Sequence, residues 1–319
     1  MLLRALVTAA TIGLASSLAA AKDVKTVALT YIVDHPAINA VRNGIVDALG
    51  DAGYVDGKTM KLIVQSAQGS MPTQLQIAKQ FAGEKPNLMV AISTPSAQAL
   101  QSTAGATPVV FSAVTDPVGA KLVASMEKPG ANVTGTSDMQ PLGPTLQLIK
   151  SLVPSAKRIG VVYNGGEANS VSQVQALKRE AGKEALEIIE STASQSAMVG
   201  DAARSLVGRV DAILLPTDST VISAVEGVVS VGQKAKLPIF ASDTDSVTRG
   251  AVAALGFNYY ALGKLSGKMA ADILGGSSPS TMAVGTLQTQ DLYLNIKSAV
   301  AMGVEVPESL KASAAKVIN

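Results

Sequence analysis

The sequence contains no cysteine and a single histidine, His35, and aromatic residues make up only 3% of its 319 residues. Without cysteine the chain can form no disulfide, thiolate nucleophile, cysteine-ligated zinc site or lipid-modified N-terminal cysteine. A single histidine argues against a histidine-rich metal site and against a Ser/His/Asp triad. We therefore expect a protein that is not an enzyme and that has neither a metal site nor a cofactor.

Charge is sparse and nearly balanced. Lys and Arg number 26 against 24 Asp and Glu, so the formal net charge is only +2, and the basic residues form no run. This balance indicates no nucleic-acid partner. The hydrophobic fraction of 47% is that of an ordinary globular chain, and the length suggests two domains.

The first 21 residues have the pattern of a secretory signal peptide. A short start that carries Arg4 is followed by an apolar run of small residues, and residues 19–21 match an A-x-A cleavage site. The alternative, a membrane anchor, is disfavoured because the run is short for a bilayer span. We expect cleavage after Ala21 and a periplasmic mature protein with no lipid anchor.

Apolar β-rich runs alternate with segments of helical spacing along the mature chain, which is typical of a parallel sheet covered on both faces. Short helices are expected at 118–126 and elsewhere, and the tail after residue 287 is expected to hold one strand and two short helices. After residue 137 the pattern restarts. Three segments of the first half have counterparts at similar offsets in the second: 25–29 and 158–162, 86–90 and 210–214, and 107–111 and 237–240. The predicted fold is therefore α/β, with two doubly wound parallel-sheet lobes and a ligand cleft between them.

Polar residues follow the expected strands of both lobes, and ligands of open parallel sheets bind beyond the carboxyl ends of the strands. At Thr94 a strand leads through a Ser/Thr/Pro turn into a helix, whose free N–H groups suit an anion. An aspartate suits an ammonium group instead. The candidates from this pattern are His35, Thr94, Ser96, Thr115, Asp116, Asn164, Glu167, Ser170, Asp218 and Asp243.

Helix capping offers a second explanation for several of these residues. Thr94 and Asp116 each precede a proline, as N-cap residues before Pro at N1 often do. Asp218 and Asp243 also stand at expected N-cap positions. The sequence leaves both the capping and the ligand interpretation open for these residues.

Specific strings carry a family resemblance over essentially the whole mature chain: TPSAQ at 94–98, VTDP at 114–117, PGANVTG at 129–135 and GVVYN at 160–164. In these strings the chain resembles ABC-transporter substrate-binding proteins of the tryptophan/tyrosine uptake type. One departure is Gly166, where the family leads us to expect proline. The resemblance implies a type I periplasmic-binding-protein fold with three hinge crossings, and lobe closure on an aromatic or other apolar amino acid.

By the same resemblance, the ligand's carboxylate is expected near Thr94, Ser96, Ala97 and Gln98. Thr115 and Asp116 would lie beside it, and the second lobe would close over it with five polar residues: Asn164, Glu167, Ser170, Asp218 and Asp243. We expect residues 22–136 plus about 257–286 to form the N-terminal lobe. Residues 137–256 plus about 287–319 would form the C-terminal lobe.

The expected function is that of a monomeric periplasmic binding protein of an ABC importer. Its partners would be a small zwitterionic ligand and a membrane permease. Two alternatives stay open: an exported sensory receptor that signals to a membrane sensor, and an exported enzyme that uses the cleft carboxylates. The missing cysteine, histidine and metal motifs argue against the enzyme.

Overall fold

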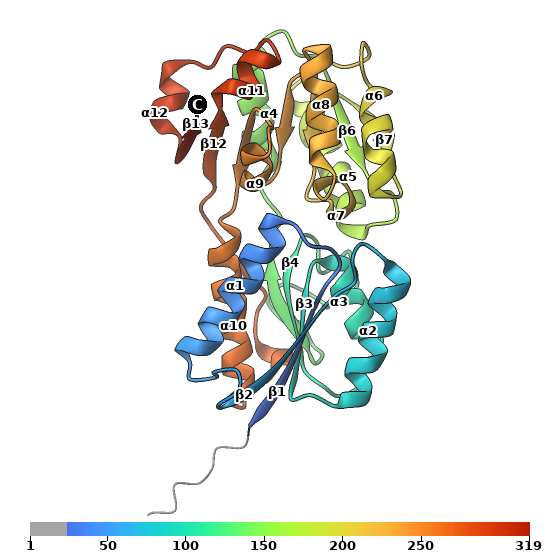
Figure 1. The fold of residues 1–319 in the computed structure, drawn as a ribbon, viewed down its shortest axis with the longest axis vertical. Coiled ribbons are helices and arrows are strands. Elements are labelled where there is room, and N and C mark those ends of the chain that lie inside the picture. Colours follow the sequence, from blue (N-terminus) through green and yellow to red (C-terminus); the bar gives the residue numbers. More distant parts are fainter. Residues whose placement is uncertain (1–23) are drawn as a thin grey trace, which may run out of the picture.

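The computed structural model describes residues 24–319, which form two lobes stacked along the long axis of the molecule (Figure 1). The expected signal peptide, residues 1–21, lies outside the described residues. Each lobe is a largely parallel sheet flanked by helices, and the chain passes from one lobe to the other three times. The predicted α/β fold with two parallel-sheet lobes is confirmed.

The N-terminal lobe contains a six-stranded sheet in the order β11-β5-β4-β3-β1-β2, in which every pair is parallel. Strands β3, β4 and β5 are buried along their whole length because helices cover both faces. The strands are β1 (Lys25–Tyr31), β2 (Met60–Ser66), β3 (Leu88–Ile92), β4 (Val109–Val114), β5 (Val133–Ser137) and β11 (Gly285–Thr286). The helices are α1 (Pro36–Asp51), α2 (Met71–Glu84), α3 (Thr94–Gln101), α10 (Tyr259–Leu274) and the 3-10 turn η2 (Pro279–Thr281).

The C-terminal lobe repeats this topology. Its seven-stranded sheet has the order β13-β12-β10-β9-β8-β6-β7, so β7-β6-β8-β9-β10 corresponds to β2-β1-β3-β4-β5. Only β12 runs antiparallel to its neighbour β10. The strands are β6 (Arg158–Tyr163), β7 (Glu187–Thr192), β8 (Ala212–Leu215), β9 (Ile239–Ala241), β10 (Ala253–Gly256), β12 (Asp291–Asn295) and β13 (Lys316–Ile318). The helices are α4 (Leu142–Leu152), α5 (Ala168–Lys183), η1 (Ser196–Met198), α6 (Val199–Arg204), α7 (Ser219–Ile222), α8 (Val225–Ala235), α9 (Thr244–Thr248), α11 (Ile296–Ala301) and α12 (Glu308–Ser313).

Helix α10 follows the second lobe in sequence but packs along α1 in the first (Figure 1). Glycines make this close approach possible. A Cβ atom on Gly263 would lie 2.1 Å from the carbonyl oxygen of Val41, and one on Gly44 would lie 2.2 Å from that of Tyr260. Helix α10 thereby covers the apolar face of α1. The same packing fixes the N-terminus of α10 at the junction of the lobes.

Two expectations from the sequence are wrong in detail. Residues 118–126 form turns, not a helix, because Lys121 has a φ of 61° and the N–H groups of Leu122 and Val123 both bond to the carbonyl of Pro117. The tail holds two strands, β12 and β13, where one was expected.

Hydrogen bonds tie the three crossings to one another. Tyr259, at the second crossing, donates its hydroxyl to Oδ2 of Asp138, at the first crossing, over 2.9 Å. Gln290, at the third, donates Nε2 to Oε1 of Gln140 over 2.8 Å, and Gln140 donates in turn to the carbonyl of Ser242 over 2.5 Å. Two separate sets of hydrogen bonds therefore join the first crossing to the second and to the third.

Candidate ligand-binding site

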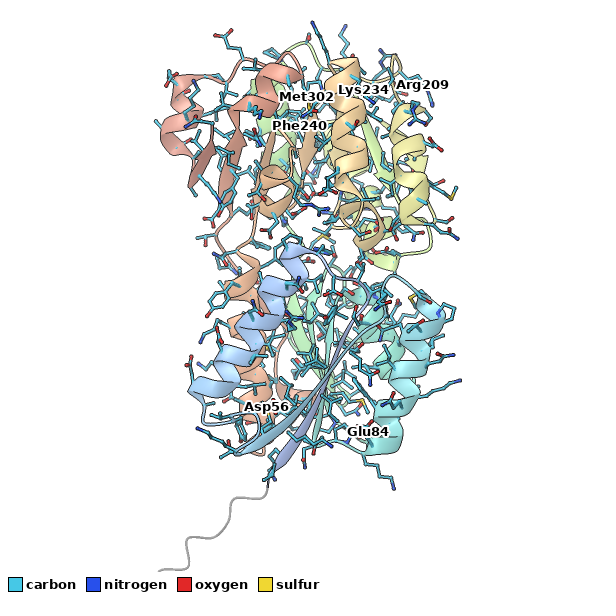
Figure 2. The ribbon with its side chains drawn as sticks, viewed as in Figure 1. Asp56, Glu84, Arg209, Lys234, Phe240 and Met302 are labelled. Atoms are coloured by element: carbon cyan, nitrogen blue, oxygen red, sulfur yellow. The ribbon has the colours of Figure 1, made fainter. Side chains whose placement is uncertain are left out.

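The carboxyl ends of the strands from both lobes meet at the junction, and two spaces lie between them. The charged residues Asp56, Glu84, Arg209 and Lys234 lie at the opposite, outer ends of the lobes (Figure 2). The smaller space, here called the inner chamber, measures about 30 Å³ and is lined by His35, Ala37, Ile38, Ser93, Thr94, Ala113, Asp138, Asn169, Thr217, Ser219, Ile222 and Tyr259. The larger space, the outer cavity, measures about 750 Å³ and is lined by residues 32–33, 68–72, 95 and 98 of the first lobe and 164, 166–167, 194–197, 219–220 and 223 of the second.

Four buried polar atoms of inner-chamber residues find no hydrogen-bond partner among residues 24–319. They are Nδ1 of His35, Oγ1 of Thr94, Oδ1 of Asp138 and Oδ1 of Asn169. Their residues are between 1% and 7% exposed. An unpaired buried polar group costs roughly 1–3 kcal/mol, so such a cluster is rare unless something else satisfies it. The inner chamber is thus equipped to bind a small polar group.

The first-lobe side of the chamber is built at the start of α3. Buried strand β3 ends at Ile92, and Ser93 then takes φ 81° and ψ 157°, a conformation that L-residues seldom adopt. Ala113, in the irregular end of β4, also has a positive φ of 54°. Such residues cost roughly 1–3 kcal/mol each and gather at functional sites. Both of them line the inner chamber, so part of its surface is built from strained backbone.

Asp138 and Tyr259 form the hinge side of the chamber. Burial raises the pKa of Asp138, while the nearby Thr115 side chain and the hydrogen bond from Tyr259 act in the opposite direction. Burial and the nearby Asp138 carboxylate hold the pKa of Tyr259 well above its usual value, so its hydroxyl remains a donor. No Lys or Arg is among the lining residues of either space. The free oxygen of Asp138 therefore lacks a cationic partner from the described part of the chain.

His35 contributes a neutral imidazole. Burial, followed by the positive charge of Arg249, lowers its pKa to about 3. The ring adds a hydrogen-bonding group to the chamber without adding charge.

The second-lobe side is held by two buried carboxylates. Glu167 accepts the backbone N–H groups of Ser219 and Thr220, each over 3.1 Å, and the Thr220 hydroxyl over 2.7 Å. Asp218 accepts from the Asn164 N–H and the Ser170 hydroxyl, each over 2.6 Å. Burial and then the charge of Glu167 raise the pKa of Asp218 to about 7. These bonds fix Ser219, which lines both spaces.

The residues predicted from sequence fall into three groups. His35 and Thr94 line the inner chamber, whereas Gln98, Asn164 and Glu167 line the outer cavity. Thr115 bonds across the cleft to Thr217, hydroxyl to hydroxyl, over 3.2 Å. The remaining six line neither space: Ser96, Ala97, Asp116, Ser170, Asp218 and Asp243.

Three of those six are helix or turn caps. Asp116 accepts the N–H of Gly119, Asp218 that of Val221 and Asp243 that of Ser246, each over 2.8 Å. Ser96 points into its own lobe and donates to Gln74 over 3.0 Å. The capping interpretation thus describes the structural role of these aspartates, and their contact with a ligand stays a prediction.

Sequence reasoning did not select Asp138, Asn169 or Tyr259. Asp138 follows β5 directly, so the strand-end rule that selected Thr94 applies to it as well. Asn169 lies in the same turn as Glu167 and Ser170. Tyr259 could not have been found in this way, because its position depends on the return of α10 to the first lobe.

Comparison with known proteins identifies the family. The model of the family described as ABC transporter substrate binding protein matches residues 26–318. The chain belongs to this family. Its substrate-binding proteins are extracytoplasmic; they bind small ligands, interact with transporter permeases and are not catalytic. The lobes have the type I periplasmic-binding-protein fold, which more distant sugar- and inositol-binding structures share. Among residues 24–319, no helix combines the length and the apolar character needed to cross a membrane.

Three relatives of this substrate-binding protein are informative. A tyrosine-binding protein of Clostridioides difficile is 41% identical over 89% of this chain and 82% of its own length. An ABC domain from Streptococcus pneumonia in complex with L-Trp is 34% identical, with a TM-score of 0.90 over 93% of this chain and all of the other. A third relative is a Clostridium difficile substrate binding protein with adhesive properties, in its ligand-free, open structure. It is 41% identical, with a TM-score of 0.70 over 93% of this chain and all of the other.

Proposed function

We propose that this protein captures a small α-amino acid, aromatic or apolar, for an ABC importer, and that its two lobes close on that ligand. The observation that carries the proposal is the inner chamber, a small space between the lobes with unpartnered buried polar atoms from both of them. The tyrosine-binding and L-Trp-complexed relatives support an amino acid as the ligand.

The chamber suits the charged core of an amino acid. Its volume of about 30 Å³ holds roughly two water-sized groups, enough for an ammonium and part of a carboxylate but not for a large side chain. Thr94 offers a hydroxyl at the start of α3, where the helix dipole favours an anion. Because Ser219 lines both spaces, we place the ligand's side chain toward the outer cavity.

Lobe closure is supported by the two TM-scores. Sequence identity is higher with the open, ligand-free relative, at 41%, than with the L-Trp complex, at 34%. The TM-score is nevertheless higher with the L-Trp complex, at 0.90, than with the open relative, at 0.70. A closed arrangement of the lobes accounts for this reversal. Ligand binding would then shift a population from open to closed molecules, the form that a permease can recognise.

We further propose that the protein acts in the periplasm after loss of residues 1–21, as a monomer that delivers its ligand to a membrane permease. Its lobes would comprise residues 22–136 with about 257–286, and 137–256 with about 287–319. The sheet membership of β5, β11 and β12 supports this division.

A thermal-shift screen of the mature protein against the twenty amino acids tests the function. At 100 times its Kd a ligand adds about 2.7 kcal/mol, which raises the Tm by roughly 5 °C. We expect such a rise with aromatic or apolar amino acids and a much smaller one in Thr94→Val. The matched control is Ser102→Ala, whose hydroxyl bonds within the other end of α3. If no amino acid raises the Tm of the wild-type protein, the proposal is wrong.

A further inference from the structure

The carboxylate of Asp138 is satisfied on one side only. Its Oδ2 accepts the Tyr259 hydroxyl over 2.9 Å, but its Oδ1 has no partner among the described residues, although Asp138 is only 3% exposed. A buried carboxylate without a cationic partner is strongly unfavourable. Its free oxygen therefore points to a positively charged group that the ligand supplies.

A second unpartnered acceptor lies across the same chamber. Asn169 donates Nδ2 to the carbonyl of Thr217 over 2.8 Å, while its Oδ1 is buried and unpaired. The other titratable side chains in the chamber lining are His35, which burial keeps neutral, and Tyr259, whose raised pKa keeps its hydroxyl protonated. Arg249 influences His35 but lines neither space. Two acceptors that lack a donor suit a primary ammonium, which has three donors and no acceptor.

We propose that Asp138 is the counter-ion of the ligand's α-ammonium group, that Asn169 accepts a second ammonium hydrogen, and that Tyr259 is the positioning residue that holds Asp138 in place. This inference rests on the proposed function and specifies how the same site recognises its ligand. The ammonium would thus bind a residue other than the capping aspartates Asp116, Asp218 and Asp243.

The position of the pair links recognition to the hinge. Asp138 lies at the first crossing, directly after β5, and Tyr259 opens α10 at the second, shortly after β10. The bond between them thus joins two of the segments that must bend when the lobes move. An ammonium bound to the free oxygen fixes the carboxylate, and through it the closed arrangement of both crossings. Ligands that lack the amine lose both effects.

Isothermal titration with L-tryptophan and with its deamino analogue, indole-3-propionate, tests the inference. The two probes share the indole ring and the carboxylate and differ in the α-ammonium. A charge-assisted bond is worth about 1.5–3 kcal/mol, or roughly 10- to 100-fold in Kd. We expect wild-type protein to prefer L-tryptophan by about that factor or more, and Asp138→Asn to abolish the preference by weakening L-tryptophan alone.

Tyr259→Phe separates positioning from packing, because it keeps the ring and removes only the hydroxyl. We expect it to weaken L-tryptophan by roughly 10-fold, leave indole-3-propionate unchanged and shift the loss of L-tryptophan affinity on acidification to higher pH, since Asp138 loses a hydrogen bond that favours its ionised form. The control is Asp201→Asn, an exposed carboxylate on α6, which should change neither affinity.

The outcomes separate the two proposals. If wild-type protein binds no amino acid, the proposed function is overturned. If it binds L-tryptophan but Asp138→Asn retains the preference over indole-3-propionate, only the present inference is overturned. Equal weakening of both probes in Asp138→Asn or Tyr259→Phe would assign those residues a structural role and would likewise overturn it.

Discussion

His35 is a buried neutral histidine in the lining of the inner chamber, and it is the one histidine of the chain. Its pKa is about 3 in the folded protein, whereas an unfolded chain has the ordinary value near 6.5. On acidification the unfolded state takes up a proton on His35 first. The free energy of unfolding therefore decreases as the pH falls from about 6.5 toward 3.

We predict that His35→Asn makes the protein less sensitive to acid. Between about pH 7.5 and pH 5, the wild-type free energy of unfolding should lose about 2 kcal/mol that the variant retains. Asp218 and Asp245, with pKa values raised to about 7 and about 6, act in the opposite sense, because their contribution is lost as the pH rises through those values. They are common to both proteins, so the difference isolates His35. Urea unfolding at several pH values measures it, and parallel pH profiles would contradict the prediction.

Single residues also mark the limit of sequence-based prediction at this site. Asp138 and Asp218 both follow strands of a parallel sheet, so the pattern favours them equally. In the structure Asp218 has its oxygens occupied by three donors, whereas Asp138 keeps one oxygen free. Whether an aspartate caps a helix or faces a ligand depends on partners that are distant in sequence, and the local sequence does not encode them.

At the scale of elements, the contact between α1 and α10 holds the N-terminal lobe together and places Tyr259 at the hinge. We predict that Gly263→Ala destabilises the protein by about 3 kcal/mol, because the added methyl would lie 2.1 Å from the Val41 carbonyl oxygen and force the helices apart. The matched control is Gly50→Ala near the end of α1, where a Cβ meets nothing within 4 Å and helix propensity should add up to about 1 kcal/mol. Thermal and urea unfolding compare the two, and similar stabilities would contradict the packing argument.

The buried strands were predictable because their apolar runs are short and bounded by turn residues; the repeated segment at 86–90, for example, overlaps β3, at Leu88–Ile92. The expected helix at 118–126 failed for a local reason. The Asp116 side chain takes the N–H of Gly119, and Lys121 adopts a left-handed conformation, so the segment closes into turns. Apolar spacing alone does not distinguish a packed turn from a helix of the same length.

At the scale of the whole molecule, the hydroxyl contact between Thr115 and Thr217 joins the two lobes across the cleft. We predict that Thr115→Val weakens amino-acid binding by about 3- to 10-fold, the effect of one buried hydrogen bond of about 0.5–1.5 kcal/mol. The variant should also be more open at subsaturating ligand, as a larger radius of gyration in small-angle scattering. Thr192→Val, at an exposed position of β7, is the control. An unchanged affinity in Thr115→Val would show that the contact does not stabilise closure.

The last part of the chain belongs to both lobes. Helix α10 and strand β11 complete the first sheet and its cover, and β12 and β13 complete the second. During synthesis, therefore, neither lobe is finished until the final segments have emerged, and the apolar face of α1 waits for a helix that is more than two hundred residues downstream. Long-range contacts of this kind slow folding. The nascent chain thus stays incompletely folded until late in synthesis, a state that would suit the proposed export better than a first lobe that folds at once.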